Sequence, residues 1–194
     1  MADYVTLKDH CKIRIGYLAR SKIEPEVHGS HYLLQMRDFT DDRRTITLDS
    51  MIRISPTKVA PEACIQNGDV VFMSKGIRHF AAAAYDLPTP CLAASYFFIL
   101  RPSPELLPAY LAQYINQPEA QQHFKRFGSS GAQPVVSRST LESLRLRLPS
   151  LETQTMIIEI DSLAQREHSL RTELAQKKHL FSTMLCRSLA ESNH

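Results

Sequence analysis

The stretch Asn67-Gly68-Asp69-Val70-Val71-Phe72-Met73-Ser74-Lys75-Gly76 joins a tight turn to a short apolar run. Asn-Gly is a strong turn signal, because both residues tolerate the left-handed backbone that such a turn requires. The β-branched and aromatic residues that follow are typical of a buried strand. We therefore expect a turn at 67–69 and a strand over 70–73 inside a sheet.

Three segments outward from this stretch predict further strands. Residues 32–36 are mostly apolar, residues 92–100 form a long apolar run, and residues 144–148 alternate leucine with arginine. The long run predicts one central strand, and the alternation predicts a half-buried strand. The charged segment 37–47 predicts a hairpin or loop between strands.

Helix signals begin after the long apolar run. Ser103-Pro104-Glu105 predicts a helix start, and apolar residues recur at helical spacing over 106–115. Pro118-Glu119 predicts a second short helix, and Ser139-Thr140-Leu141-Glu142 matches a capping box. We expect an α/β (α+β) domain over residues 1–149, with a mixed twisted sheet and a small helical subdomain.

Residues 150–194 contain no glycine and no proline, which predicts one long C-terminal helix and a short tail. A helix of about forty residues reaches on the order of 60 Å, more than a small domain needs. Its apolar side chains form a heptad seam that favours a coiled coil with a partner helix, although packing against its own domain is the alternative. The seam residues are Met156, Ile160, Leu163, Leu170, Leu174, Phe181 and Met184.

Three seam positions are not apolar: Glu167, Lys177 and Ser188. Parallel pairing of two copies would set like charges against each other, whereas antiparallel pairing brings Glu167 near Lys177. We expect a homodimer with antiparallel helices.

Bulk composition indicates a globular protein, with 43% hydrophobic and 22% charged residues. The four cysteines are scattered, which argues against thiol metal sites and disulfides. The polar N-terminus and the lack of a long apolar run lead us to expect a cytoplasmic protein. Residues 1–150 carry a net charge of +4 and residues 151–194 a net charge of −1, so the excess positive charge lies in the domain. This fits a polyanionic partner.

Several segments, in order, resemble the specificity subunits of type I restriction-modification systems. A second glycine, common in that family after the first segment, is replaced here by Ile77-Arg78-His79-Phe80. Those subunits commonly carry two recognition domains and two helices, so the resemblance points to a half-length form or a stand-alone relative. The resembling segments are Gly68–Gly76, Tyr96–Pro102, Leu107–Glu119, Gly128–Gln133 and Leu144–Gln154.

Catalytic motifs are missing from the sequence. A methyltransferase needs a glycine-rich cofactor loop and a nuclease needs grouped carboxylates. The one adjacent acid pair, Asp41-Asp42, is followed by two arginines and is typical of a solvated turn. We expect no enzyme activity, no cofactor and no metal site, with no metal at the loop histidines His28 and His31.

Candidate DNA-binding residues lie in four segments that offer cations for phosphates and polar groups for base edges. We expect Gln133 to pair with adenine and the serines of its loop to approach phosphates. The candidates are Lys12, Arg14, Tyr17, Arg20 and Lys22; Arg37, Arg43 and Arg44; Lys75, Arg78 and His79; and Lys125, Arg126, Ser129, Ser130, Gln133 and Arg138.

The resemblance implies recognition of a half-site in double-stranded DNA, with a separate modification methyltransferase docked through the long helix. A motor-nuclease subunit completes such systems, and these partners supply the S-adenosylmethionine and ATP chemistry. Two alternatives stay open. One is a recognition module of another phage-defence or regulatory complex, and the other is a nuclease with an unrecognised site.

Overall fold

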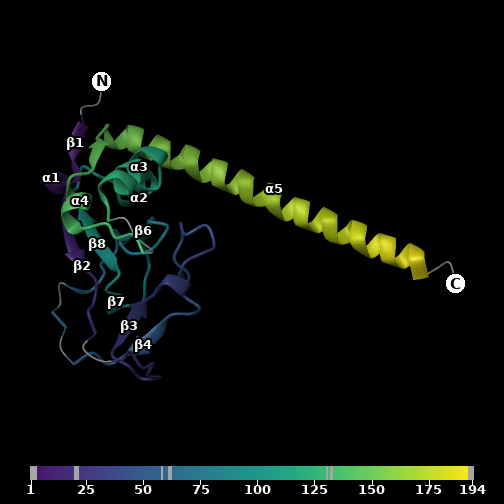
Figure 1. Ribbon diagram of the computed structural model, residues 1–194, viewed down its shortest axis with the longest axis horizontal. Helices are drawn as coiled ribbons and strands as arrows, with labels where there is room; N and C mark the ends of the chain where they lie inside the picture. The colour runs from purple at the N-terminus through teal and green to yellow at the C-terminus, as the bar shows by residue number, and fades with distance from the viewer. Residues whose placement is uncertain are drawn as a thin grey trace. The chain divides into compact units, whose positions relative to one another are not determined.

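The computed structural model describes residues 4–19, 22–57, 59–60, 63–129, 131 and 133–191. The chain divides between Thr155 and Met156 into two compact units. The first is a mixed α/β domain, and the second contains most of one long helix (Figure 1). This agrees with the predicted fold class.

The described residues of the domain form three small sheets, with strand orders β1-β9, β2-β8-β5-β6 and β4-β3-β7. Every neighbouring pair is antiparallel except β3 and β7, which are parallel. The strands are β1 Tyr4–Thr6, β2 Cys11–Ile15, β3 His31–Leu34, β4 Ile52–Ile54, β5 Asp69–Met73, β6 Ala81–Ala84, β7 Cys91–Ala93, β8 Phe97–Pro102 and β9 Arg145–Arg147.

Strand β5 is an inner strand of the four-stranded sheet. All five residues of β5 are buried, and Val71 lies opposite Ile99 in β8 and Ala82 in β6. Gly68 adopts a φ of 86°, the left-handed backbone that favours glycine, so the predicted turn precedes the strand. In Figure 1 this sheet lies between the three-stranded sheet and the helices of the domain.

The prediction of one central strand over 92–100 is wrong. The run contains two strands, β7 and β8, which belong to different sheets and are separated by a turn at Ser95 and Tyr96. Phe97 N–H donates to the carbonyl of Ala94 across this turn, at 2.9 Å. The run stays apolar through the turn because both strands contribute to the same buried core. Apolar periodicity therefore could not reveal the break.

The segment after β3 begins with a short 3₁₀ helix, Met36–Asp38, so the first predicted strand ends two residues early. A single bridge between Phe39 and Ile46 then closes a tight loop, as the charged segment indicated. Asp38 is fully buried and holds the loop, because its carboxylate accepts hydrogen bonds from Gln35 N–H and the Ser50 hydroxyl.

The helices confirm the predicted subdomain but not all of its boundaries. The second predicted helix agrees with α3, whereas α2 begins at Pro108 because residues 103–106 form a turn. The Oγ of Ser103 caps nothing and is buried without a partner among the described residues. The cap of α4 is Ser137, which accepts from Thr140 N–H, and not Ser139. The helices are α1 Leu7–His10, α2 Pro108–Ile115, α3 Pro118–Phe127, α4 Arg138–Glu142 and α5 Leu151–Glu191.

Buried and half-buried polar side chains join these elements. Asp69, 1% exposed, accepts two hydrogen bonds of 2.7 Å from the guanidinium of Arg101 and a third from Gln66 N–H. Asn116, at the end of α2, bonds both the N–H and the carbonyl of Ala81 in β6. Since unpaired polar groups are costly inside a protein, these contacts fix the order of sheet and helices.

A fully buried amide anchors the first turn of α5. Gln154 is fully buried, and its carbonyl accepts from Leu107 N–H at 2.8 Å. Its amide donates to the carbonyls of Glu105 and Pro149. The start of the long helix is therefore part of the domain core.

The second unit carries the predicted seam on the helix surface. The seven apolar seam side chains are between 49% and 71% exposed. Ion pairs within the helix join Glu167 to Arg171 and Lys177 to Glu173. Among the described residues, no helix is both long enough and apolar enough to cross a bilayer.

Candidate DNA interface

Three segments that are far apart in the sequence meet on one side of β5. Gly76 N–H donates to the carbonyl of Pro134, and Val136 N–H donates to the carbonyl of Ser74. A β-bridge also joins Lys75 to Val135. The loop after β5 and the loop before α4 are therefore paired backbone to backbone, and this places Lys75 beside Gln133.

Tyr96 brings in the third segment. Its hydroxyl accepts a hydrogen bond of 3.1 Å from Met36 N–H, and its carbonyl accepts from both the N–H and the hydroxyl of Ser74. Burial raises the pKa of Tyr96, while the bond from Met36 and the nearby Arg37 act in the opposite direction. We call the surface formed by the loops of Lys75, Tyr96 and Gln133 the three-loop surface; it consists of Lys75, Ile77, Arg78, Tyr96 and Gln133, together with Arg37 near Tyr96.

An open pocket of about 470 Å³ lies within this surface, and most of its lining is apolar. Ile77, on its rim, is 89% exposed, which is unusual for an isoleucine. The charged groups of Arg37, Lys75 and Arg78 belong to exposed side chains. The pocket is lined by Met73, Lys75, Gly76, Ile77, Tyr96 and Gln133.

The last turn of α3 adds two exposed cations, Lys125 and Arg126, with the guanidinium of Arg126 over the Phe127 ring. The loop that follows is closed by Ser129, whose hydroxyl accepts from Val135 N–H at 2.9 Å and whose N–H donates to the Val135 carbonyl. Ser129 therefore shapes the loop. Arg138 is exposed but pairs with Glu142 one helical turn away.

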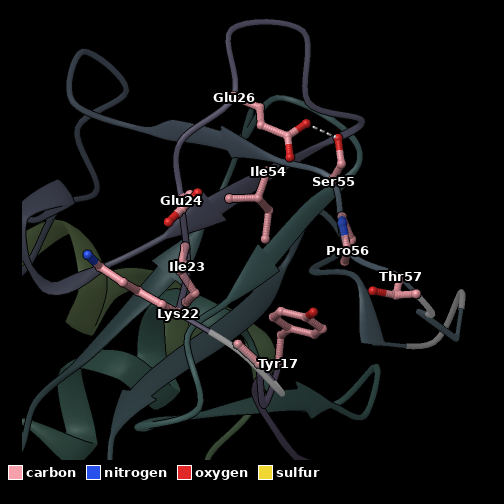
Figure 2. A pocket seen from close by; sticks show the side chains of 10 residues that line it. Tyr17, Lys22, Ile23, Glu24, Glu26, Ile54, Ser55, Pro56 and Thr57 are labelled. Atoms are coloured by element: carbon pink, nitrogen blue, oxygen red, sulfur yellow. Dashed lines mark hydrogen bonds between the residues drawn. The ribbon is translucent and has the colours of Figure 1, made fainter.

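Tyr17 and Lys22 line a separate, polar pocket, shown in Figure 2. The amino group of Lys22 extends away from Tyr17, and the carboxylate of Glu26 accepts a hydrogen bond from Ser55. Lys12 and Arg14 share one face of β2, the edge strand of the four-stranded sheet. The structure thus places the N-terminal candidates apart from the pocket of the three-loop surface.

Two candidates hold the fold instead of facing solvent. Arg43 has a φ of 64°, and its guanidinium donates to the carbonyl of Met36 at 2.9 Å. His79 is 9% exposed, lies 3.0 Å from the Met73 carbonyl and stacks on Phe72. This burial removes His79 from the candidate interface. Arg44 is half-buried, and Arg20 and Ser130 lie outside the described residues.

The burial of His79 predicts a pH effect on stability. Burial lowers its pKa below the ordinary value of about 6.5, so in acid the unfolded chain binds a proton that the folded chain resists. Neutral His79 therefore contributes to the free energy of unfolding in full above about pH 6.5, and this stability is lost as the pH falls through the pKa of His79 in the folded chain. We expect the urea midpoint to fall from pH 7.5 to pH 5 less steeply in His79→Gln than in the wild type. The exposed His28→Gln should keep the wild-type slope, and an equally steep fall in His79→Gln would contradict the assignment.

Sequence reasoning missed Ile77 and Tyr96 as surface residues. The apolar run 92–100 predicts Tyr96 inside a strand, and the family pattern marks Ile77 only as a departure. The available signal for Ile77 was its position between Gly76 and Arg78, since an isoleucine beside a glycine and a cation does not continue a strand. Among the described residues, no three His, Cys, Asp or Glu side chains gather closely enough to hold a metal ion.

A family model described as the type I restriction modification DNA specificity domain matches residues 3–174. The chain belongs to this family. The match covers most of the domain and part of α5, and it confirms the resemblance seen in the sequence. Among curated proteins, no sequence match is found.

Three solved structures share the fold of this specificity domain. One comes from a study of complex assembly and conformational transition of the type I R-M system; it is 23% identical with a TM-score of 0.62, and the match covers 90% of this chain and 41% of that chain. The HsdS subunit from Thermoanaerobacter tengcongensis is 23% identical with a TM-score of 0.55, and the match covers 87% of this chain and 38% of that chain. The S subunit from M. genitalium is 12% identical with a TM-score of 0.52, and the match covers 85% of this chain and 40% of that chain. The chain spans about two fifths of the length of these relatives.

The residues that carry the family resemblance are mostly structural. Asp69 and Arg101 belong to two of the resembling segments and form one ion pair, and Asn116 and Gln154 belong to two others. Of the three-loop surface, Lys75, Tyr96 and Gln133 also lie within resembling segments, whereas Arg37, Ile77 and Arg78 lie outside them.

Proposed function

We propose that this chain recognises a short half-site in double-stranded DNA and catalyses no reaction itself. The observation that carries the proposal is the three-loop surface, where exposed cations surround an amide and an apolar pocket. Cations supply affinity for phosphates, and the amide and the pocket supply groups that distinguish bases. Membership in the specificity-domain family supports the same role.

Within this proposal residues 1–149 form the recognition domain and residues 150–194 form the pairing helix and its tail. Gln133 is the base-reading amide, and its pair with adenine involves N6 and N7 in the major groove. Lys75, Arg78 and Arg37 flank it and contact phosphates. Lys125 and Arg126 extend the basic surface along the loop that carries Gln133.

Removing Lys125 and Arg126 tests the phosphate contacts. In Lys125→Ala/Arg126→Ala we expect weaker binding to every duplex alike, with the slope of log K against log salt flatter by about one unit per lost contact. The measurement is fluorescence anisotropy of a labelled duplex across a salt series. Arg166→Ala/Lys178→Ala removes the same charge from α5 and should leave the slope unchanged. An unaltered slope in the first variant would exclude that pair from the interface.

Two copies pair through α5 in this proposal, and the seam sequence favours a particular antiparallel register. When the helices cross at Thr172, Leu170 faces Leu174, Leu163 faces Phe181, and Ile160 faces Met184. The same register sets Glu167 of one copy against Lys177 of the other. Every one of these layers is therefore apolar or oppositely charged, whereas parallel pairing stacks like charges.

The pairing helix also offers a dock for a modification methyltransferase, which would carry out the chemistry on DNA. The recognition module of a different phage-defence or regulatory complex would use the same surfaces with another partner. Copurification of the chain with the proteins encoded beside it distinguishes these two partners.

A further inference from the structure

The pocket of the three-loop surface has a composition that suits one kind of base pair. Its walls are the side chains of Met73, Tyr96 and Ile77, and the Gln133 amide stands at its edge. Met73 is 7% exposed, and the hydroxyl of Tyr96 is already bonded to Met36 N–H. The walls therefore offer a mostly apolar surface beside the Gln133 amide.

The walls are also held in place before any ligand arrives. Ser74 bonds the carbonyl of Tyr96 twice, through its N–H and its hydroxyl, at 2.9 and 2.7 Å. The backbone of Gly76 is bonded to Pro134. Since little ordering is left to occur on binding, a contact as small as one methyl group can affect affinity measurably.

Resting on the proposed function, we propose that this pocket reads an A·T base pair from the major groove. Gln133 pairs with the adenine, and the C5-methyl group of the thymine enters the apolar pocket against Ile77. In the major groove only thymine presents a methyl group, and apolar side chains recognise it by contact. Lys75 and Arg78 beside the pocket, with Arg37, complement the phosphates on either side of that base pair.

An exposed isoleucine between cations fits this role better than it fits a protein contact. A protein-binding surface would extend the apolar area beyond the pocket, whereas here Lys75 lines the pocket and the exposed Arg78 follows Ile77 in the chain. The proposed contact between Ile77 and the thymine methyl group involves one exposed side chain, so it can select a base without a change in the fold.

The test uses the whole chain and a labelled duplex containing the half-site enriched from a random library. Each thymine is replaced in turn by uracil, which lacks only the methyl group. We expect one position, an A·T pair, where this change weakens binding about fourfold, the effect of burying one methyl group. In Ile77→Ser the same replacement should have no further effect. In Gln133→Ala it should keep its effect, while the preference for adenine at that pair falls about fivefold or more.

Val27→Ser is the matched control, because Val27 is 84% exposed and lies outside the pocket. It should keep the wild-type response to uracil. Specific binding with no uracil-sensitive position, a response that survives in Ile77→Ser, or a half-site without an A·T pair would overturn the inference and leave the proposed function standing. Absence of any enriched half-site would instead overturn the proposed function.

Discussion

Replacing Leu170 and Leu174 by glutamate should convert the 194-residue chain from a dimer into a monomer at micromolar concentration. In the antiparallel register these residues face each other at the centre of the seam, and both are about half exposed in the single chain. Each leucine contributes on the order of 2 kcal/mol when buried, so the four in a dimer contribute about 8 kcal/mol. That corresponds to more than about five orders of magnitude in Kd.

Sedimentation velocity measures this change, and Ser169→Glu/Ala175→Glu is its control. These two positions lie on the same part of α5 but outside the seam, so that variant should stay dimeric. Circular dichroism should show equal helix content in both variants. A monomeric wild type would refute self-pairing and leave the seam as the dock for a different protein.

Cysteine cross-linking reports the direction of the pair. With Cys186 replaced by serine, Ile160→Cys/Met184→Cys should form a disulfide-linked dimer, because the two positions face each other in the antiparallel register. Each single substitution should not. Linking by either single substitution would indicate parallel helices.

Deleting the carboxylate of Asp69 should cause a large loss of stability in the domain. Asp69→Ala leaves Arg101 and Gln66 N–H without their acceptor at the start of the inner strand β5. Breaking a buried pair typically costs ~3–5 kcal/mol, and we expect about 3 kcal/mol because Arg101 is 27% exposed and regains water. Chemical denaturation measures the free energy of unfolding.

Asp41→Ala removes the same group from an exposed loop and should change that free energy by less than about 0.5 kcal/mol. Equal small effects in both variants would show that the Asp69–Arg101 pair does not hold the sheet together. DNA binding per folded molecule should be unaltered in each, since neither residue lies on the three-loop surface.

Local patterns predicted the elements whose signals are contained in a few neighbouring residues. The turn before Asp69, the helix opening at Pro118 and the glycine-free helix from Leu151 all follow from backbone preferences that act within one turn. The break at Ser95 and Tyr96 does not, because two sheets share one core and the apolar run continues through both. The start of α2 was also misplaced, since Pro104 and Pro108 are both suitable first residues of a helix and only packing selects between them.

The candidate site depends on contacts that no local pattern contains. Lys75 and Val135 form a bridge across 60 positions of sequence, and that bridge brings Gln133 to the pocket beside Ile77. Counting cations identified Lys75 and Arg78 but also His79, whose burial between Phe72 and Phe124 is a tertiary effect. Charge and residue type therefore indicated a DNA-binding domain, while the arrangement of its surface required the three-dimensional structure.

Selection from a random duplex library tests the central claim most directly. The purified chain is incubated with the library at moderate salt, bound duplexes are recovered over several rounds, and the enriched sequences are determined. The account predicts one short motif containing an A·T pair, with enrichment weakened in Gln133→Ala. Sequence recognition by this chain would be contradicted if the bound duplexes share no motif and their affinity depends on salt concentration but not on base sequence.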